Sequence, residues 1–172
     1  MRLSDRPLLT AAEIQARVAV LGKSISEEYR GKELTVVAVL KGGVVFVSDL
    51  IRQLQVPLTL EFIRARSYQG HLSQGIVELP VLPEQPLRGC HVLVVEDIVD
   101  TGRTTAAILD RLAAEQPASL ALCCLLDKPA RHIAPIRIQF VGFTIDDHFV
   151  VGYGLDYHER YRELPAIYVL QE

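Results

Sequence analysis

The chain has 172 residues, the length of one domain with a single substantial hydrophobic core. Its formal net charge of -3 provides no basic field for nucleic acid or for an anionic membrane. We therefore expect neither as a partner, and any bound phosphate must be held by a local site. With 49% hydrophobic and 23% charged residues, the composition is ordinary for a soluble globular protein, and no apolar run approaches the ~20 residues that cross a bilayer.

The first elements predicted along the chain are a helix and a buried strand. Thr10 and Glu13 have the spacing of a capping box, so a helix should begin after Thr10 and run to about Arg30, where Gly31 ends it. Residues 34–40, LTVVAVL, form a continuous β-branched run without alternation, which is typical of a strand buried on both faces.

A glycine-containing turn and an amphipathic helix follow that strand. The turn is KGG, residues 41–43, and the helix is predicted at 44–54. Two strands, at 58–65 and 76–81, then flank a polar loop with the sequence SYQGHLSQG. The first half of the chain therefore alternates strands and helices.

The second half continues this alternation. A buried strand is predicted at 90–95, a helix at 104–115 and another strand at 120–126. Two further strands are predicted at 136–141 and 149–151, before a C-terminal segment rich in tyrosine and charge.

Strands and helices that alternate at this spacing predict an α/β fold, with a mostly parallel twisted sheet flanked by helices. No internal repeat and no long linker divides the chain, so we expect residues 1–172 to form a single domain. In such sheets, ligands bind beyond the carboxyl ends of the strands. Candidate functional residues should therefore lie there.

The three cysteines indicate a reducing compartment. Cys90, Cys123 and Cys124 lie in strand-like apolar runs and form no CxxC pair, which favours reduced thiols in a cytoplasmic protein. The N-terminus also lacks the apolar core and cleavage site of a signal peptide. The vicinal Cys123–Cys124 pair is compatible with buried small hydrophobic residues or with a redox switch.

The segment 91–112, HVLVVEDIVDTGRTTAAILDRL, has the pattern of a phosphate site. Gly102 permits a tight turn whose N–H groups point into one concavity, and the start of the following helix adds unpaired donors and a positive dipole. Threonine hydroxyls and one guanidinium complete the predicted cradle for a phosphate monoester. Its members are Asp100, Thr101, Gly102, Arg103, Thr104 and Thr105.

Two adjacent acids, Glu96 and Asp97, come just before this cradle. They would repel each other unless they held the hydroxyls of a sugar or a Mg²⁺ ion. The alternative is a solvated acidic turn in which Asp100 or Thr101 simply caps the helix.

A second candidate anion site follows the strand at 34–40. The glycines of LKGG let backbone amides approach an anion closely, and Lys41 adds positive charge. The alternative is a plain strand-to-helix turn.

An apolar strand, two acids, two variable residues and then D-T-G-x-T together resemble the 5-phosphoribosyl-1-pyrophosphate signature of type I phosphoribosyltransferases. LKGG matches the pyrophosphate loop of the hypoxanthine-guanine branch, and LLDKP, FVGF and FVVGYGLDYxxxYR are similar to its C-terminal half. The resemblance implies the type I fold, with a small hood built from the chain termini. It also implies transfer of a phosphoribosyl group to hypoxanthine or guanine in purine salvage, with Mg²⁺ as cofactor, giving IMP or GMP and pyrophosphate.

Position by position, the resemblance assigns roles to residues in four groups. Pyrophosphate would be bound by Lys41, Gly42 and Arg162, with a cis peptide between Leu40 and Lys41. Ribose and metal would be held by Glu96, Asp97 and Asp156. The purine would be contacted by Lys128 at its O6 atom, by the stacked ring of Phe149, by the backbone of Val150 and by Asp156. A lid over the reacting carbon would carry Ser67 and Tyr68.

Asp100 is the candidate general base, which would accept the proton of purine N7 so that N9 can attack C1 of the ribose. The substrates expected as partners are therefore a 6-oxopurine and the sugar pyrophosphate, and the resemblance implies a homodimer or homotetramer. Three alternatives remain open. They are a non-enzymatic regulator on the same fold, a phosphoacceptor receiver domain, and a sister transferase for xanthine or uracil.

Overall fold

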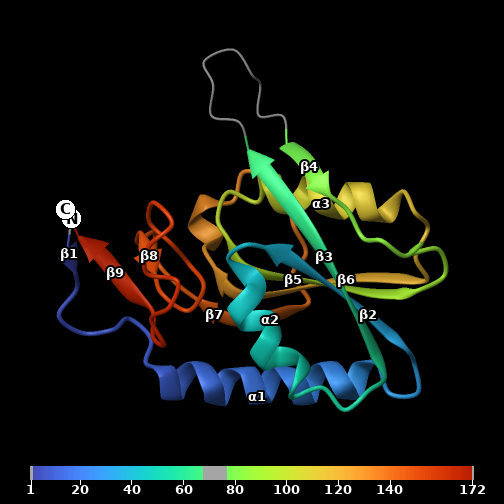
Figure 1. Ribbon diagram of the computed structural model, residues 1–172, viewed down its shortest axis with the longest axis horizontal. Coiled ribbons are helices and arrows are strands. Elements are labelled where there is room, and N and C mark those ends of the chain that lie inside the picture. Colours follow the sequence, from blue (N-terminus) through green and yellow to red (C-terminus); the bar gives the residue numbers. More distant parts are fainter. Residues whose placement is uncertain (1, 68–76, 172) are drawn as a thin grey trace.

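The computed structural model describes residues 2–67 and 77–171 and is built around one six-stranded sheet (Figure 1). The strand order is β4-β3-β2-β5-β6-β7, and every neighbouring pair is parallel except β3 with β4. This confirms the predicted mostly parallel sheet. The strands are β2 (Leu34–Leu40), β3 (Leu58–Ser67), β4 (Val77–Val81), β5 (His91–Val99), β6 (Ser119–Asp127) and β7 (Phe140–Thr144).

Helices cover both faces of this sheet. In Figure 1, α1 and α2 lie on one side of the sheet and α3 lies on the other. The helices are α1 (Ala11–Glu28), α2 (Gly43–Ile51) and α3 (Arg103–Ala113), and a short 3₁₀ turn, η1 (Pro129–Arg131), follows β6.

A small second sheet joins the two ends of the chain. It has the order β1-β9-β8, from β1 (Arg2–Leu3), β9 (Tyr168–Gln171) and β8 (Val150–Val151), and its pairs are antiparallel. The termini therefore lie side by side, away from the main sheet (Figure 1). This is the hood of chain termini that the sequence predicted.

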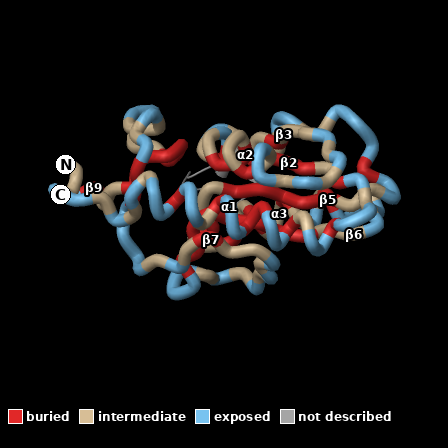
Figure 2. The backbone as a smooth tube through the Cα atoms, turned by 90° about the horizontal axis from the view of Figure 1, so that it is seen from below, coloured by how far each residue is buried: buried red, intermediate tan, exposed pale blue. Residues whose placement is uncertain are grey.

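The core consists of two hydrophobic layers that share the central strands, which are buried along most of their length (Figure 2). Val36 and Ala38 of β2 pack in the layer under α1 and α2, whereas Val37 and Val39 pack in the layer under α3. Because side chains alternate across a strand, a sheet covered on both faces needs apolar residues at every position. This explains the unbroken apolar run in β2.

The vicinal cysteines follow the same alternation. Cys123 packs in the layer of α1 and α2, and Cys124 packs in the layer of α3. Both are fully buried, and burial raises the pKa of each thiol far above its ordinary value. The structure therefore favours buried small hydrophobic residues over a redox switch.

The predicted boundaries hold well where a local signal defines them. The capping box is present, since the Glu13 N–H donates to the Thr10 hydroxyl (3.3 Å) and the Thr10 N–H donates to the Glu13 carboxylate (2.8 Å). Such a cap stabilises a helix by about 1 kcal/mol. At the other end, α1 stops at Glu28, two residues before the predicted Arg30, and Gly31 follows the last turn with a φ of +77°.

The strand predicted at 136–141 is confirmed only at its last two residues, because β7 runs from Phe140 to Thr144. The preceding segment packs Ile136 and Ile138 against the α3 layer instead of pairing in the sheet. The backbone N–H of Gln139 donates to the Leu122 carbonyl, and the Leu122 N–H donates to the Gln139 side chain. Pairing with β6 then starts at Phe140.

Across the two described ranges, no helix is both long and apolar enough to span a membrane.

Candidate active site

Three neighbouring strands, β2, β5 and β6, bring the predicted site residues to one edge of the sheet (Figure 1). Lys41 follows β2, Asp100 follows β5, and Lys128 follows β6. The β5–β6 register pairs Val99 with Asp127, and the Lys128 N–H donates to the Val99 carbonyl at 3.0 Å. The turns after β5 and β6 therefore lie side by side.

The turn after β5 leads directly into α3. Gly102 precedes the helix with a φ of +80°, a left-handed conformation that glycine adopts without steric cost. A Cβ at Gly102 would also meet Cδ1 of Ile136 at 2.6 Å. Within the described part of the chain no side chain caps α3, so the N–H groups of its first turn are available to an anion. This geometry matches the predicted phosphate cradle.

The threonines of the cradle have different surroundings. Thr101 and Thr104 are half-buried and Arg103 is exposed, so all three can reach a ligand. Thr105 is buried, and its hydroxyl donates to the Glu96 carboxylate at 2.6 Å. The hydroxyl of Thr105 therefore supports Glu96 rather than lining the cradle as expected, and its backbone N–H is the group left for a phosphate.

The two adjacent acids lie inside a strand, not after one. β5 runs to Val99, whereas the sequence predicted that it would end at residue 95. Because neighbouring residues of a strand point to opposite faces, Glu96 faces Thr105 of α3 and Asp97 faces Gly42 before α2. The expected repulsion between two carboxylates at a strand end is thus reduced by the strand itself.

The pKa values of both acids are raised. Burial raises the pKa of Glu96 to about 8, against the lowering effect of its hydrogen bond from Thr105. Burial also raises the pKa of Asp97 to about 6, opposed by hydrogen bonds from its own N–H and that of Ile98 and by the charge of Arg162. Acids with strongly raised pKa values are common at functional sites.

The LKGG loop fits closely between β5 and the C-terminal segment. A Cβ at Gly42 would overlap the Asp97 carboxylate and lie 2.6 Å from its Cγ. On the other side, Gly154 has a φ of +98°, and a Cβ there would overlap the Gly42 carbonyl. The peptide between Leu40 and Lys41 is cis, as the resemblance implied. Only glycine at position 42 lets this loop lie against Asp97.

Two cations and two carboxylates meet beside this loop. The Arg162 guanidinium contacts the Asp156 carboxylate at 2.8 Å and donates to the Gly154 carbonyl at 2.7 Å. The Glu159 carboxylate lies 3.0 Å from Lys41 Nζ and 3.1 Å from Arg162 Nη2. The two predicted pyrophosphate ligands are therefore joined through a residue that the sequence did not single out.

An apolar ring and a buried ammonium group lie at the end of β6 and the start of β8. Lys128 is only 6% exposed, and its Nζ donates to the His148 carbonyl at 2.6 Å. Phe149 is 54% exposed and meets the ring of Tyr157 edge-on, with centroids 5.8 Å apart. Val150 is buried in β8 beside it. An exposed aromatic face near a buried donor suits a heteroaromatic ring that carries an exocyclic oxygen.

A chain of charges connects this wall to the phosphate turn. Arg131 of η1 donates to the Asp100 carboxylate at 2.6 Å and to the Asp147 carboxylate at 3.2 Å. Asp147 in turn lies 3.7 Å from Lys128 Nζ. The candidate base and the candidate purine ligand therefore belong to one electrostatic network.

Most of the predicted residues converge here, apart from the two assigned to the lid. The backbone of Ser67 ends β3, but its side chain is not described, and Tyr68 lies outside the described residues. Sequence reasoning missed Glu159, Arg131 and Asp147. Their only signal is ordinary charge in loops, and the Lys41–Glu159 pair spans 118 positions of sequence.

The donor set fits the Mg²⁺ ion that the resemblance implies. Asp97 and Asp156 are close enough for the charge of Asp156 to raise the pKa of Asp97, although burial is the larger cause. Among the described residues, no three His, Cys, Asp or Glu side chains are grouped to hold a metal on their own. Mg²⁺ is usually bound by one or two carboxylates together with substrate phosphates, and this pair can provide such ligands.

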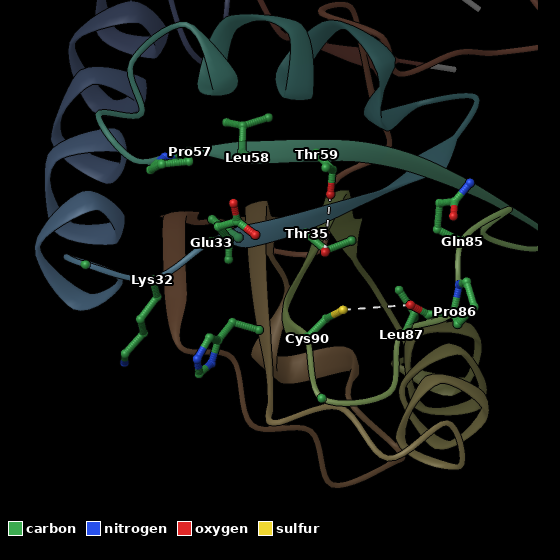
Figure 3. Close-up of a pocket in the computed structure, with 14 residues that line it drawn as sticks. Lys32, Glu33, Thr35, Pro57, Leu58, Thr59, Gln85, Pro86, Leu87 and Cys90 are labelled. Atoms are coloured by element: carbon green, nitrogen blue, oxygen red, sulfur yellow. Dashed lines mark hydrogen bonds between the residues drawn. The ribbon is translucent and has the colours of Figure 1, made fainter.

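A cavity of about 550 Å³ lies at the opposite edge of the sheet (Figure 3). It is lined by the amino ends of β2, β3 and β5, where the Thr59 hydroxyl donates to the Thr35 hydroxyl at 3.3 Å. Cys90 and Pro86 face each other across its rim, with 3.7 Å between the thiol and the Pro86 carbonyl. Among the residues that the structure describes, no predicted site residue lines this cavity.

Comparisons with known proteins show what the whole chain is similar to. The family model described as "Phosphoribosyl transferase domain" matches residues 8–158. The chain is 44% identical over 171 residues to the hypoxanthine phosphoribosyltransferase of Salmonella typhimurium, covering 97% of this chain and 96% of that protein.

Solved structures give the same result. A hypoxanthine-guanine phosphoribosyltransferase from Bacillus anthracis superposes with a TM-score of 0.94 at 38% identity, covering 99% of this chain and 100% of that one. A Trypanosoma cruzi hypoxanthine phosphoribosyl transferase gives 0.93 at 36% identity, covering 99% and 93%, and its description concerns the C-terminal region, oligomeric state and activity.

Proposed function

The chain belongs to the phosphoribosyl transferase family, and we propose that it is a purine-salvage enzyme that transfers the phosphoribosyl group of 5-phosphoribosyl-1-pyrophosphate to hypoxanthine or guanine. The products are IMP or GMP and pyrophosphate. The observation that carries this proposal is the convergence of three different binding elements at the carboxyl ends of β2, β5 and β6. They are a phosphate turn, a glycine loop with a lysine, and an exposed ring beside a buried lysine.

The sugar pyrophosphate would lie across the phosphate turn and the LKGG loop. Its 5′-phosphate would be bound by the backbone of 101–105, together with the hydroxyls of Thr101 and Thr104 and the charge of Arg103. Its pyrophosphate would be bound by Lys41, the Gly42 amide and Arg162, whose charges stabilise the leaving group.

The ribose would be held between these two ends by the acids of β5. Asp97 faces the LKGG loop and would contact the ribose hydroxyls. Glu96 lies under the phosphate turn, where the Thr105 hydroxyl fixes its position. Holding the sugar at both ends places C1 between the leaving group and the purine, and this restriction accelerates a displacement reaction.

Mg²⁺ would be held by Asp97 and Asp156, in addition to oxygens of the sugar pyrophosphate. When bound, it supplies positive charge that neutralises the leaving pyrophosphate.

The purine would stack on Phe149, with its O6 atom accepting a hydrogen bond from Lys128. The Val150 backbone and Asp156 would contact the far edge of the base. Because Lys128 always presents a donor when charged, the site favours a 6-oxo group over a 6-amino group.

Asp100 would act as the general base at purine N7. In the free protein its carboxylate accepts a hydrogen bond from Arg131, which orients it at the end of the phosphate turn. A carboxylate held in this way can accept the N7 proton as N9 attacks C1. Water must be excluded while the ribose carries positive charge, and Ser67 with Tyr68 remain the residues that we propose for a lid.

We also propose that residues 1–172 fold as one cytoplasmic domain that assembles as a homodimer or homotetramer. The layer under α1 and α2 includes Val150 of β8, and Val169 of β9 packs against it, which supports a single folding unit. The three free thiols support a reducing compartment. Sedimentation equilibrium would test the assembly.

A turnover assay tests the proposed function. The enzyme, Mg²⁺ and the sugar pyrophosphate are mixed in turn with hypoxanthine, guanine, xanthine, adenine and uracil, and nucleotide formation is followed. We expect turnover with hypoxanthine or guanine and little with adenine or uracil. A preference for adenine or uracil would overturn the assignment of Lys128, and turnover of xanthine alone would identify a sister transferase.

A further inference from the structure

Glu159 occupies the position between the two cations assigned to pyrophosphate. Its carboxylate lies 3.0 Å from Lys41 Nζ and 3.1 Å from Arg162 Nη2, so one oxygen bridges both. Lys41 comes from the end of β2 and Arg162 from the loop before β9, and Glu159 links these two distant parts of the chain. A phosphate oxygen that contacts both cations would have to occupy the position of this carboxylate oxygen.

The backbone holds Glu159 in this place. Its φ is +64°, which is uncommon for a residue other than glycine, and its N–H donates to the Asp156 carboxylate at 2.9 Å. The side chain is 63% exposed, so it can swing away without disturbing the core. Lys41 and then Arg162 hold the pKa of Glu159 below its usual range, which keeps the carboxylate charged.

Other carboxylates also lie around the two cations. Asp156 contacts Arg162 at 2.8 Å, and the charge of Arg162 also lowers the pKa of Asp97, so these acids together with Glu159 already offset the positive charges of Lys41 and Arg162. Pyrophosphate carries several negative charges, and the Glu159 carboxylate occupies the point at which one phosphate oxygen could contact both cations. Binding of a phosphate oxygen at that point would displace the Glu159 carboxylate.

We propose that Glu159 is a resident anion of the pyrophosphate site, which leaves when pyrophosphate or the sugar pyrophosphate binds and returns when pyrophosphate is released. The inference rests on the proposed function and adds a positioning residue to it. Glu159 keeps Lys41 and Arg162 facing the same point in the free enzyme. It also weakens pyrophosphate binding, and so favours product release.

The expected effect follows from the two exposed ion pairs that are displaced. Pairs of this kind each contribute about 1.5- to 5-fold to an equilibrium constant. Replacing Glu159 by glutamine removes the competing charge and keeps the size of the side chain. Pyrophosphate should then bind about 2- to 25-fold more tightly to Glu159→Gln than to the wild type.

Calorimetric titration with inorganic pyrophosphate and Mg²⁺ tests the proposal. The matched control is Glu163→Gln, which makes the same charge change at an exposed residue of the same segment. We expect the control to match the wild type, and product inhibition by pyrophosphate to become stronger only in Glu159→Gln. The gain should shrink when Lys41 is replaced by methionine, because the displaced pair is then already absent.

Two outcomes would overturn the inference in distinguishable ways. If the wild type binds pyrophosphate and Glu159→Gln binds it equally or more weakly, Glu159 is an ordinary surface residue and the proposed function stands. If the wild type binds no pyrophosphate, and Lys41→Met changes nothing, both the inference and the proposed function fail.

Discussion

Replacing Gly42 by alanine should disable the site while leaving the fold largely intact. Gly42 has helical dihedral angles, φ -56° and ψ -41°, so the backbone tolerates alanine and the effect is steric. The new Cβ would overlap the Asp97 carboxylate and lie 2.6 Å from its Cγ. Overpacking of this kind costs about 1–3 kcal/mol, and turning the carboxylate away costs about 0.5–1.5 kcal/mol. Asp97 should therefore move.

If Asp97 has its proposed role, the displaced side chain would no longer hold the ribose and Mg²⁺. Losing a charged hydrogen-bonding group costs about 1.5–3 kcal/mol, so kcat/KM for the sugar pyrophosphate should fall about 10- to 100-fold. Steady-state kinetics measure this fall, and urea unfolding should show a loss of stability near 1 kcal/mol.

The neighbouring glycine provides the control for this prediction. A Cβ at Gly43 would lie 3.4 Å from the Val95 carbonyl oxygen, which is close to ordinary contact. Gly43→Ala should therefore keep its activity. If the Gly42 and Gly43 variants have the same kcat/KM within about threefold, the packing of the LKGG loop against Asp97 does not matter for function, and the reasoning is refuted.

Three further predictions concern single residues. Asp100→Asn should lower kcat about 10²- to 10⁴-fold and change binding of the sugar pyrophosphate by less than about tenfold, and turnover within about threefold of the wild type would exclude Asp100 as the base. Because burial raises the folded-state pKa of Glu96 from 4.5 to about 8, its contribution to stability is full below pH 4.5 and is lost as the pH rises through about 8. In urea unfolding, the stability of Glu96→Gln relative to the wild type should therefore rise as the pH increases. A stability difference that does not change with pH would contradict the buried position of Glu96. Iodoacetamide should modify Cys90 in the native protein and spare Cys123 and Cys124, which are fully buried, so mass spectrometry that finds either of the latter labelled first would contradict the packing.

The sequence predicted those features of the fold that have a local cause. The buried run at 34–40 and the capping box of Thr10 and Glu13 are short-range signals, and both elements formed as expected. The strand expected at 136–141 formed only from residue 140, because its alternating isoleucines also suit a loop that packs on α3. The choice between a strand and such a loop depends on the folded structure, in which Ile136 lies against the space left by the missing side chain of Gly102.

The sequence predicted which residues lie at this end of the sheet, but not which of their side chains contact one another. Gly102 and Lys41 follow buried strands, and the carboxyl ends of parallel strands meet at one edge. The bridges made by Glu159 and Arg131 depend on how loops far apart in sequence fold back onto that edge. Glu96 and Asp97 point to opposite faces because β5 continues to Val99, and no residue within 96–99 signals where the strand ends.

The most direct test of the central claim is the stoichiometry of the reaction. Enzyme, Mg²⁺, hypoxanthine and the sugar pyrophosphate are mixed, and IMP and pyrophosphate are measured together as they form. One surface that holds phosphate, leaving group and purine at once predicts one IMP for each pyrophosphate, and no pyrophosphate when the base is omitted. Release of pyrophosphate without nucleotide, or binding of both substrates without either product, would contradict it.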